Sequence, residues 1–165
     1  MRNLFLIGLP GSGKTTVGRL AARELGLPFV DCDEAVSHEA GMTIPEIFRQ
    51  EGEDAFRNWE SRCLASLAAG GGKVIATGGG VVLRPENHRI LARGLTVFLD
   101  RTPEAILAGC ELGDRPLLAT TSLQALSEAR RELYLACADV TITDEEPLTC
   151  AAVAAAYWRE QGCVY

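Results

Sequence analysis

Lysine is scarce in this chain of 165 residues, which contains two lysines against fourteen arginines. Histidine is equally rare, and the six cysteines include no C-x-x-C pair, so the sequence indicates free thiols rather than a zinc or disulfide framework. No apolar run is long enough to span a bilayer, and no signal peptide is recognisable. The net charge of −6 argues against a nucleic-acid or membrane surface. We therefore expect a cytoplasmic protein whose basic residues gather around an anionic ligand.

Strand patterns alternate with helix patterns along the chain, which predicts a parallel sheet covered by helices on both faces. The expected strands are residues 4–7, 28–31, 73–77, 95–100 and 139–143. The expected helices are residues 16–25, 85–92, 103–108, 122–138 (capped by Thr121) and 148–160. Residues 34–70 are expected to be helical pieces broken at Gly41 and Gly52, with a capping box at Thr43 and Glu46. The length fits one domain, residues 1–165, in which 34–70 is an insertion.

The segment Gly8-Leu9-Pro10-Gly11-Ser12-Gly13-Lys14-Thr15 fits the pattern G-x-x-x-x-G-K-[ST]. An apolar strand precedes it and a helix follows it, which is the context that a phosphate-binding loop requires. Glycines let successive backbone N–H groups turn toward phosphate oxygens, and the helix N-terminus adds a favourable dipole. Lys14 would reach the outer phosphates and Thr15 would ligate Mg²⁺. The predicted nucleotide-binding residues of this loop are Gly11, Ser12, Gly13, Lys14, Thr15 and Thr16.

Two carboxylates, Asp31 and Asp33, end the second expected strand. Their two-residue spacing directs both to the same side of an extended chain, at the sheet edge where ligands bind. One carboxylate can hold Mg²⁺ through water, and the other can accept a hydrogen bond from an attacking hydroxyl. Asp33 can equally be the N-cap of the helix that follows, and the pattern alone does not decide between these roles.

Two triple-glycine runs differ in their position. Gly70-Gly71-Gly72 follows a helix and is expected to be a C-cap and loop. Gly78-Gly79-Gly80 follows a strand at the ligand-binding edge, where missing side chains let the backbone approach a substrate closely. We therefore predict that Gly78, Gly79 and Gly80 belong to the site.

Two arginines are candidates for binding an anion. Arg57 has Glu60 three residues later on the same helix face, close enough to orient its guanidinium; the alternative is a solvated helix face. Arg130 falls on the apolar stripe of its helix, between Leu126 and Leu133, so it faces a partner, which a structural ion pair would also provide. The neighbouring Arg131 is expected to point to solvent.

A further arginine, Arg115, lies in the turn-rich segment 109–121 within the sequence Arg-Pro-Leu-Leu. A mobile loop with one arginine suits a lid that closes over a transferring phosphate and excludes water. An ordinary surface arginine is the alternative, and spacing does not distinguish the two.

Taken in order, these segments resemble the shikimate kinase family over nearly the whole chain. The matching segments are Gly8–Arg19, Phe29–Asp33, Gly52-Glu53 with Phe56-Arg57 and Glu60, Ala76–Gly80, Arg115–Leu118, and Arg130 with Leu133-Tyr134. The resemblance implies a P-loop nucleoside-triphosphate-hydrolase-like α/β fold of the nucleoside-monophosphate-kinase type, with a five-stranded parallel sheet. It also implies transfer of the γ-phosphate of ATP to the 3-hydroxyl of shikimate, in aromatic amino-acid biosynthesis.

Carried over to this sequence, the resemblance implies specific roles for the candidate residues. Shikimate would be bound by Asp33, Arg57, Gly79 and Arg130, with the two arginines on its carboxylate. Lys14 and the lid residue Arg115 would act on the phosphates, so that Lys14, Asp33 and Arg115 form the predicted catalytic set. Mg²⁺ would be held by Thr15, with Asp31 in its outer shell. We expect a monomer that binds ATP and shikimate and neither nucleic acid nor membrane.

The chain departs from the family pattern near the expected purine site. Family members often carry a basic residue in the helix before the lid, where this chain has Leu107-Ala108-Gly109-Cys110, and the loop after the fifth strand is acidic at 144–146. We therefore expect nucleotide recognition to depend on phosphates more than on the base.

The alternative functions are those of a related kinase of small metabolites, such as gluconate kinase, and of a non-catalytic nucleotide-binding regulator. Retention of Lys14, Asp33 and Arg115 disfavours the regulator.

Overall fold

The computed structural model describes residues 1–109 and 120–162. Five parallel strands form one sheet in the order β2-β3-β1-β4-β5. The strands are β1 (Leu4–Ile7), β2 (Phe29–Asp31), β3 (Val74–Ala76), β4 (Leu95–Leu99) and β5 (Val140–Ile142). The first strand therefore lies at the centre of the sheet, and the loop that follows it emerges in the middle of the carboxyl edge. The predicted five-stranded parallel sheet is confirmed.

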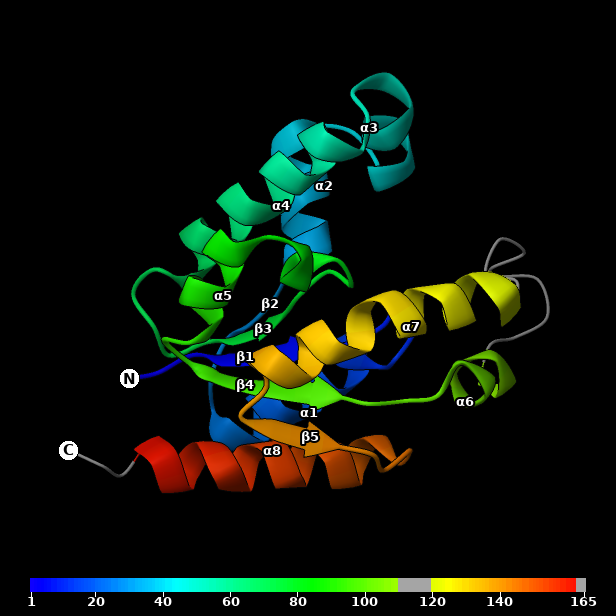
Figure 1. Ribbon diagram of the computed structural model, residues 1–165. Helices are drawn as coiled ribbons and strands as arrows, with labels where there is room; N and C mark the ends of the chain where they lie inside the picture. The colour runs from blue at the N-terminus through cyan, green and yellow to red at the C-terminus, as the bar shows by residue number, and fades with distance from the viewer. Residues whose placement is uncertain (110–119, 163–165) are drawn as a thin grey trace.

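Helices cover the sheet on both faces (Figure 1). Their bounds are α1 (Lys14–Leu25), α2 (Cys32–Ala40), α3 (Ile44–Gln50), α4 (Glu53–Ala68), α5 (Pro85–Leu91), α6 (Pro103–Ala108), α7 (Thr120–Cys137) and α8 (Pro147–Gly162). Successive side chains of β1 point to opposite faces of the sheet. Leu4 and Leu6 pack with α1 and α8 on one face. Phe5 and Ile7 pack with α4, α5 and α7 on the other. This alternation explains why a strand buried on both faces is apolar throughout.

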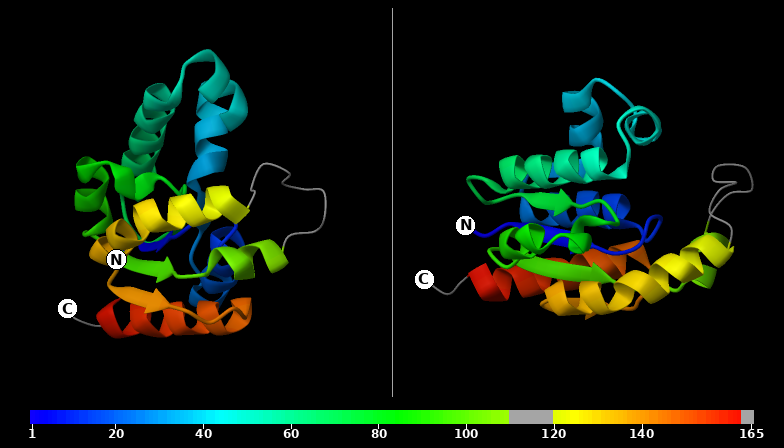
Figure 2. Two further views of the ribbon diagram at one scale, coloured as in Figure 1. Left: turned by 45° about the vertical axis from the view of Figure 1, so that its right-hand side comes forward. Right: turned by 45° about the horizontal axis from the view of Figure 1, so that its top comes forward.

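The helices α2, α3 and α4 project beyond the sheet, as the two further views show (Figure 2). They have a small core of their own, made by Val36, Ile47, Phe56 and Cys63. The predicted capping box opens α3, where the Thr43 hydroxyl accepts from the Glu46 amide and the Glu46 carboxylate accepts from the Thr43 amide. This core packs α2 and α3 against α4.

Several boundaries differ from those predicted. Helix α1 begins at Lys14, two residues earlier than expected, so the lysine belongs to the first helical turn. Helix α7 begins at Thr120, and Thr121, expected as its cap, lies inside it. A short 3₁₀ turn at Val81–Leu83 follows the second glycine run and was not anticipated. None of the described helices is long and apolar enough to cross a membrane.

Candidate active site

The phosphate-binding loop connects β1 to α1 in a backbone path that requires glycine. Gly11 and Gly13 have φ angles of 79° and 93°, in the left-handed region that other residues rarely adopt. Gly8 has a φ of 149°, and a Cβ there would lie 2.8 Å from the Leu99 carbonyl oxygen. The Lys14 ammonium is buried and donates to the carbonyls of Gly8 and Leu9, at 2.8 and 2.9 Å. These two hydrogen bonds hold the Lys14 ammonium against the phosphate-binding loop.

A cavity of about 370 Å³ opens over this loop at the carboxyl edge of the sheet. Its lining residues are Pro10, Gly11, Gly13, Lys14, Thr15, Thr16, Asp31, Asp33, Thr77 and Gly79. Both predicted carboxylates and all but one of the predicted loop residues thus line the same cavity. The exception is Ser12, which is buried behind the loop with its hydroxyl unpartnered among the described residues.

The two carboxylates have different tasks. Asp31 ends β2, whereas Asp33 lies in the first turn of α2 and not on the extended strand that its spacing predicted. Asp31 is the N-cap of α2, since its Oδ1 accepts from the amides of Asp33 and Glu34 at 2.9 and 3.3 Å. Its Oδ2 accepts from the Thr15 hydroxyl at 2.8 Å. The capping role that was open for Asp33 therefore belongs to Asp31, and the Asp33 carboxylate remains available to the cavity. The Thr15 and Asp31 oxygens are hard donors, the chemistry that Mg²⁺ prefers.

The electrostatic surroundings of Asp33 favour its protonated form. Burial raises the pKa of the Asp33 carboxyl above its ordinary value, and the neighbouring Asp31 carboxylate raises it further. Lys14 and Arg57 oppose this rise, because each places a positive charge near the carboxylate. A carboxylate in this position is a better proton acceptor than one in water.

A second cavity, of about 210 Å³, adjoins the first. It is lined by Pro10, Asp33, Ile44, Phe56, Arg57, Glu60, Gly78, Gly79, Gly80, Leu126 and Arg130. The residues shared by the two cavities are Pro10, Asp33 and Gly79. The sheet edge thus carries two compartments, one rich in backbone donors and one lined by charged side chains, with Asp33 between them.

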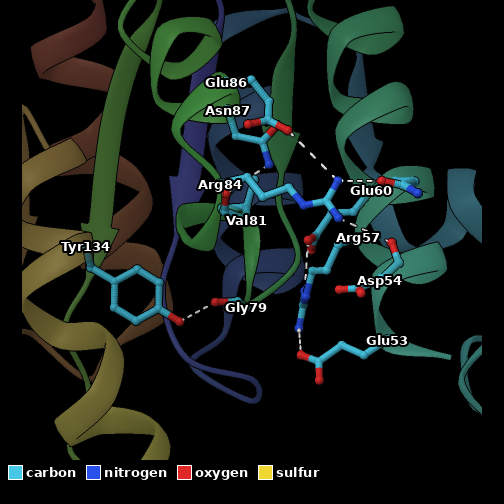
Figure 3. Close-up of polar contacts among 11 residues, drawn as sticks. Glu53, Asp54, Arg57, Glu60, Gly79, Val81, Arg84, Glu86, Asn87 and Tyr134 are labelled. Atoms are coloured by element: carbon cyan, nitrogen blue, oxygen red, sulfur yellow. Dashed lines mark hydrogen bonds and ion pairs between the residues drawn. The ribbon is translucent and has the colours of Figure 1, made fainter.

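Arg57 forms a buried ion pair with Glu60 in the second cavity (Figure 3). Its Nη1 donates to Glu60 Oε2 at 2.8 Å, as the spacing of the two residues predicted, and its Nη2 lies 3.7 Å from Glu53. The Arg57 side chain is only 11% exposed, which excludes a solvated helix face. Burial raises the pKa of the Glu60 carboxyl, although Arg57 opposes the rise. Within the described residues, Arg57 Nε and Glu60 Oε1 are buried without hydrogen-bond partners.

The glycines of the second run make room for site side chains. A Cβ at Gly78 would lie 2.5 Å from Glu60 Oε1 and 2.9 Å from Asp33 Oδ1. One at Gly80 would lie 2.1 Å from Arg57 Nη1. Our expectation that these glycines chiefly bring backbone to a substrate is therefore incomplete, because the protein's own charged groups occupy that space. The first run differs, with φ angles of 82°, 68° and 68° in the loop after α4.

Helix α7 contributes Arg130 from across the second cavity. The positive charge of Arg130 opposes the rise that burial causes in the pKa of the Glu60 carboxyl. No ion pair within the described residues involves Arg130. Arg131 is exposed, as predicted, and its guanidinium also donates to Asp100 at 2.8 Å, which ties α7 to the end of β4. Tyr134, one turn from Arg130, donates to the Gly79 carbonyl (Figure 3).

Three site residues were not identified as such from the sequence. From the sequence, Glu60 was expected only to orient Arg57. In the structure its other carboxylate oxygen, Oε1, lies beside Gly78. Tyr134 fixes the Gly79 carbonyl, and Pro10 packs against Gly79. No sequence pattern signals these contacts, because each joins elements that are far apart in the chain. The predicted lid residue Arg115 lies outside the described residues.

Comparisons with known proteins agree with this geometry. The family model described as shikimate kinase matches residues 10–158. A shikimate kinase of Symbiobacterium thermophilum is 48% identical over 155 residues, covering 88% of this chain and 89% of that protein. The solved shikimate kinase of Acinetobacter baumannii, in complex with shikimate, superposes with a TM-score of 0.88 at 34% identity and covers 100% of this chain and 96% of its own.

A gluconokinase structure from Sinorhizobium meliloti shares the fold alone. It is 16% identical with a TM-score of 0.62, and the match covers 97% of this chain and 94% of that one. The family model and the relative at 48% identity are far more specific than this likeness. The chain therefore belongs to the shikimate kinase family and is an ATP-dependent kinase.

Proposed function

We propose that this kinase transfers the γ-phosphate of ATP to the 3-hydroxyl of shikimate, with Mg²⁺ as the metal ion. The observation that carries the proposal is the contact between the two cavities at Asp33 and Gly79. A donor phosphate in the loop cavity and an acceptor in the charged cavity would meet there. Phosphoryl transfer depends mainly on such positioning and on charge neutralisation, since little covalent chemistry falls to the protein.

The acceptor cavity matches a small acid that also carries hydroxyl groups. Arg57 and Arg130 line it together and suit a carboxylate, because a planar guanidinium can bind two oxygens at once. Glu60 Oε1 and the Asp33 carboxylate are acceptors that suit hydroxyl groups. A buried acceptor without a partner is costly, so a bound hydroxyl would satisfy Glu60 at a net gain. The relative from Acinetobacter baumannii was solved in complex with shikimate, which has this composition.

On the donor side, the loop amides and Lys14 would hold the phosphates. Thr15 would ligate Mg²⁺, with Asp31 in its outer shell, and the ion would supply positive charge beside the phosphate oxygens. Asp33 would orient the attacking hydroxyl and take its proton, for which its raised pKa suits it. We further propose that Arg115 and the segment around it act as a lid within a single domain. All these residues come from one chain, so a monomer suffices.

A coupled assay of ADP release tests the proposal directly. With Mg²⁺ and ATP present, shikimate should support turnover and gluconate should support little or none. The reason is that gluconate, an open chain, cannot fill the space between Asp33 and the two arginines in the same way. Robust activity on gluconate without activity on shikimate would refute the assignment.

A further inference from the structure

The 3₁₀ turn at Val81–Leu83, which follows the second glycine run, is held by side chains of α5. The buried Asn87 donates from Nδ2 to the Val81 carbonyl at 3.0 Å. The half-buried His88 has its Nε2 2.6 Å from the Val82 carbonyl oxygen. Two successive carbonyls of the turn thus have partners on α5, which fixes the end of the glycine run on that side.

Arg84 joins the same turn to α4 on the other side (Figure 3). Its Nη1 donates to Asn58 Oδ1 at 2.6 Å, and its Nη2 donates to the Asp54 carbonyl at 3.3 Å. Asp54 and Asn58 are four positions apart, so the planar guanidinium spans one turn of the helix. The side chain is 25% exposed, which places it along the protein surface rather than in open solvent. Arg84 therefore connects α4 with the backbone that follows the glycine run.

The distance between α4 and the glycine run matters because Arg57 lies between them. A Cβ at Gly80 would be 2.1 Å from Arg57 Nη1, so the guanidinium packs directly on the backbone of the run. Glu53 and Glu60, the ion-pair partners of Arg57, belong to its own helix. They fix the guanidinium relative to α4 but not relative to the run. The contacts of Arg84, one residue after Arg57 and three before it, supply that second constraint.

We propose that Arg84 is a positioning residue for acceptor binding, which acts through Arg57. The inference rests on the proposed function, in which Arg57 binds the carboxylate of the acceptor. Pairing of a guanidinium with a carboxylate depends on direction as well as distance, so a small tilt of α4 would weaken it. Arg84 is not among the described residues that line the acceptor cavity, and none of those lining the donor cavity belongs to α4. Its influence should therefore fall on acceptor affinity alone.

Steady-state kinetics of the Arg84→Met variant test this role. Methionine keeps an unbranched stem but has no N–H donor, so both hydrogen bonds to α4 are lost. We expect the KM for shikimate to rise roughly 3- to 10-fold, as part of the loss of two charge-assisted hydrogen bonds is passed on to the acceptor. Turnover at saturating shikimate and the KM for ATP should stay within about twofold of the parent values. Arg84→Lys keeps one donor and should recover part of the affinity.

A double-mutant cycle with Arg57→Lys separates this role from a general structural one. If Arg84 acts through Arg57, Arg84→Met should raise the KM for shikimate much less in the Arg57→Lys background than in the parent. Equal increases in the two backgrounds would overturn the proposal, because Arg84 would then act independently of Arg57. A parent-like KM for shikimate in Arg84→Met, or a matching rise in the KM for ATP, would overturn it too.

Arg89→Met is the matched control, since Arg89 is exposed on α5. It should show the kinetics of the parent protein. Hydrogen exchange adds a readout that needs no acceptor: the amides of residues 54–60 should exchange faster in Arg84→Met than in Arg89→Met, whereas those of α8 should not change. Unchanged exchange at 54–60 would refute the anchoring of α4. A parent protein without activity on shikimate would instead refute the proposed function, and the exchange experiment would still decide whether Arg84 holds α4.

Discussion

The two compartments of the site differ in how many chain segments form them. The proposed donor side is mostly one continuous segment, in which backbone amides and the start of α1 would form the phosphate cradle. The acceptor side is assembled from α2, α4, the loop after β3, and α7. The first relies on backbone dipoles and the single buried ammonium of Lys14, whereas the second buries several charged side chains against one another. Substitutions should therefore affect turnover on the donor side and substrate binding on the acceptor side.

The largest expected effect comes from the loop lysine. Lys14→Ala should reduce turnover by about 10³-fold while the protein stays folded, because it removes a positive charge from the transferring phosphate. Lys73→Ala is the matched control, because Lys73 is the other lysine of the chain. Its ammonium donates to the carbonyls of Leu67 and Ala69 at the end of α4, away from the site. Steady-state kinetics should show near-normal turnover for Lys73→Ala, and equal losses in both variants would contradict the role of Lys14.

Asp33, on the boundary between the compartments, should combine a catalytic loss with a gain in stability. Asp33→Asn should lower turnover by about 10²-fold and affect the KM for shikimate less, since shape is kept and the proton acceptor is lost. Wild-type turnover would rule out this role.

The same variant should be more stable than the parent at neutral pH. Because the folded-state pKa of Asp33 is raised, its ionisation costs stability as pH rises from the unfolded-state value through the folded-state value. The gain in Tm for Asp33→Asn should therefore be small at pH 4 and larger at pH 8. A gain that shrinks with rising pH would show that the carboxylate is stabilised in the folded protein.

The acceptor side should respond mainly in substrate affinity. Arg130→Lys should raise the KM for shikimate about 10-fold, because a lysine cannot form the paired contacts of a guanidinium. Arg131→Lys is the neighbouring control, since Arg131 contacts Asp100 outside the cavity and a lysine can keep that exposed pair. Equal effects of the two substitutions on the KM would show that Arg130 does not face the substrate.

The smallest effect is expected at Tyr134, which supports the site indirectly. Tyr134→Phe removes the hydrogen bond to the Gly79 carbonyl while keeping the ring stacked near Phe98. A net loss of about 1 kcal/mol would lower Tm by roughly 2–4 °C and raise the KM for shikimate a few-fold. Circular-dichroism melting together with kinetics would measure both, and an unchanged KM would limit Tyr134 to stability.

Much of this protein follows from local patterns in its sequence. The phosphate loop, the parallel sheet and the capping box at Thr43 and Glu46 were all predicted, because each depends on neighbouring residues or on a regular period. The pairing of Arg57 with Glu60 was predicted for the same reason, since residues three apart share a helix face.

Tertiary structure alone decided the remaining contacts. Asp31 rather than Asp33 caps α2, the partner of Arg131 lies at the end of β4, and the charged groups of Glu60 and Asp33 share the space beside Gly78. Such contacts join elements that meet only when the sheet brings its carboxyl edges together, and no local propensity encodes them. The sequence by itself determined which chemistry the chain carries; the folded sheet decided which groups face one another.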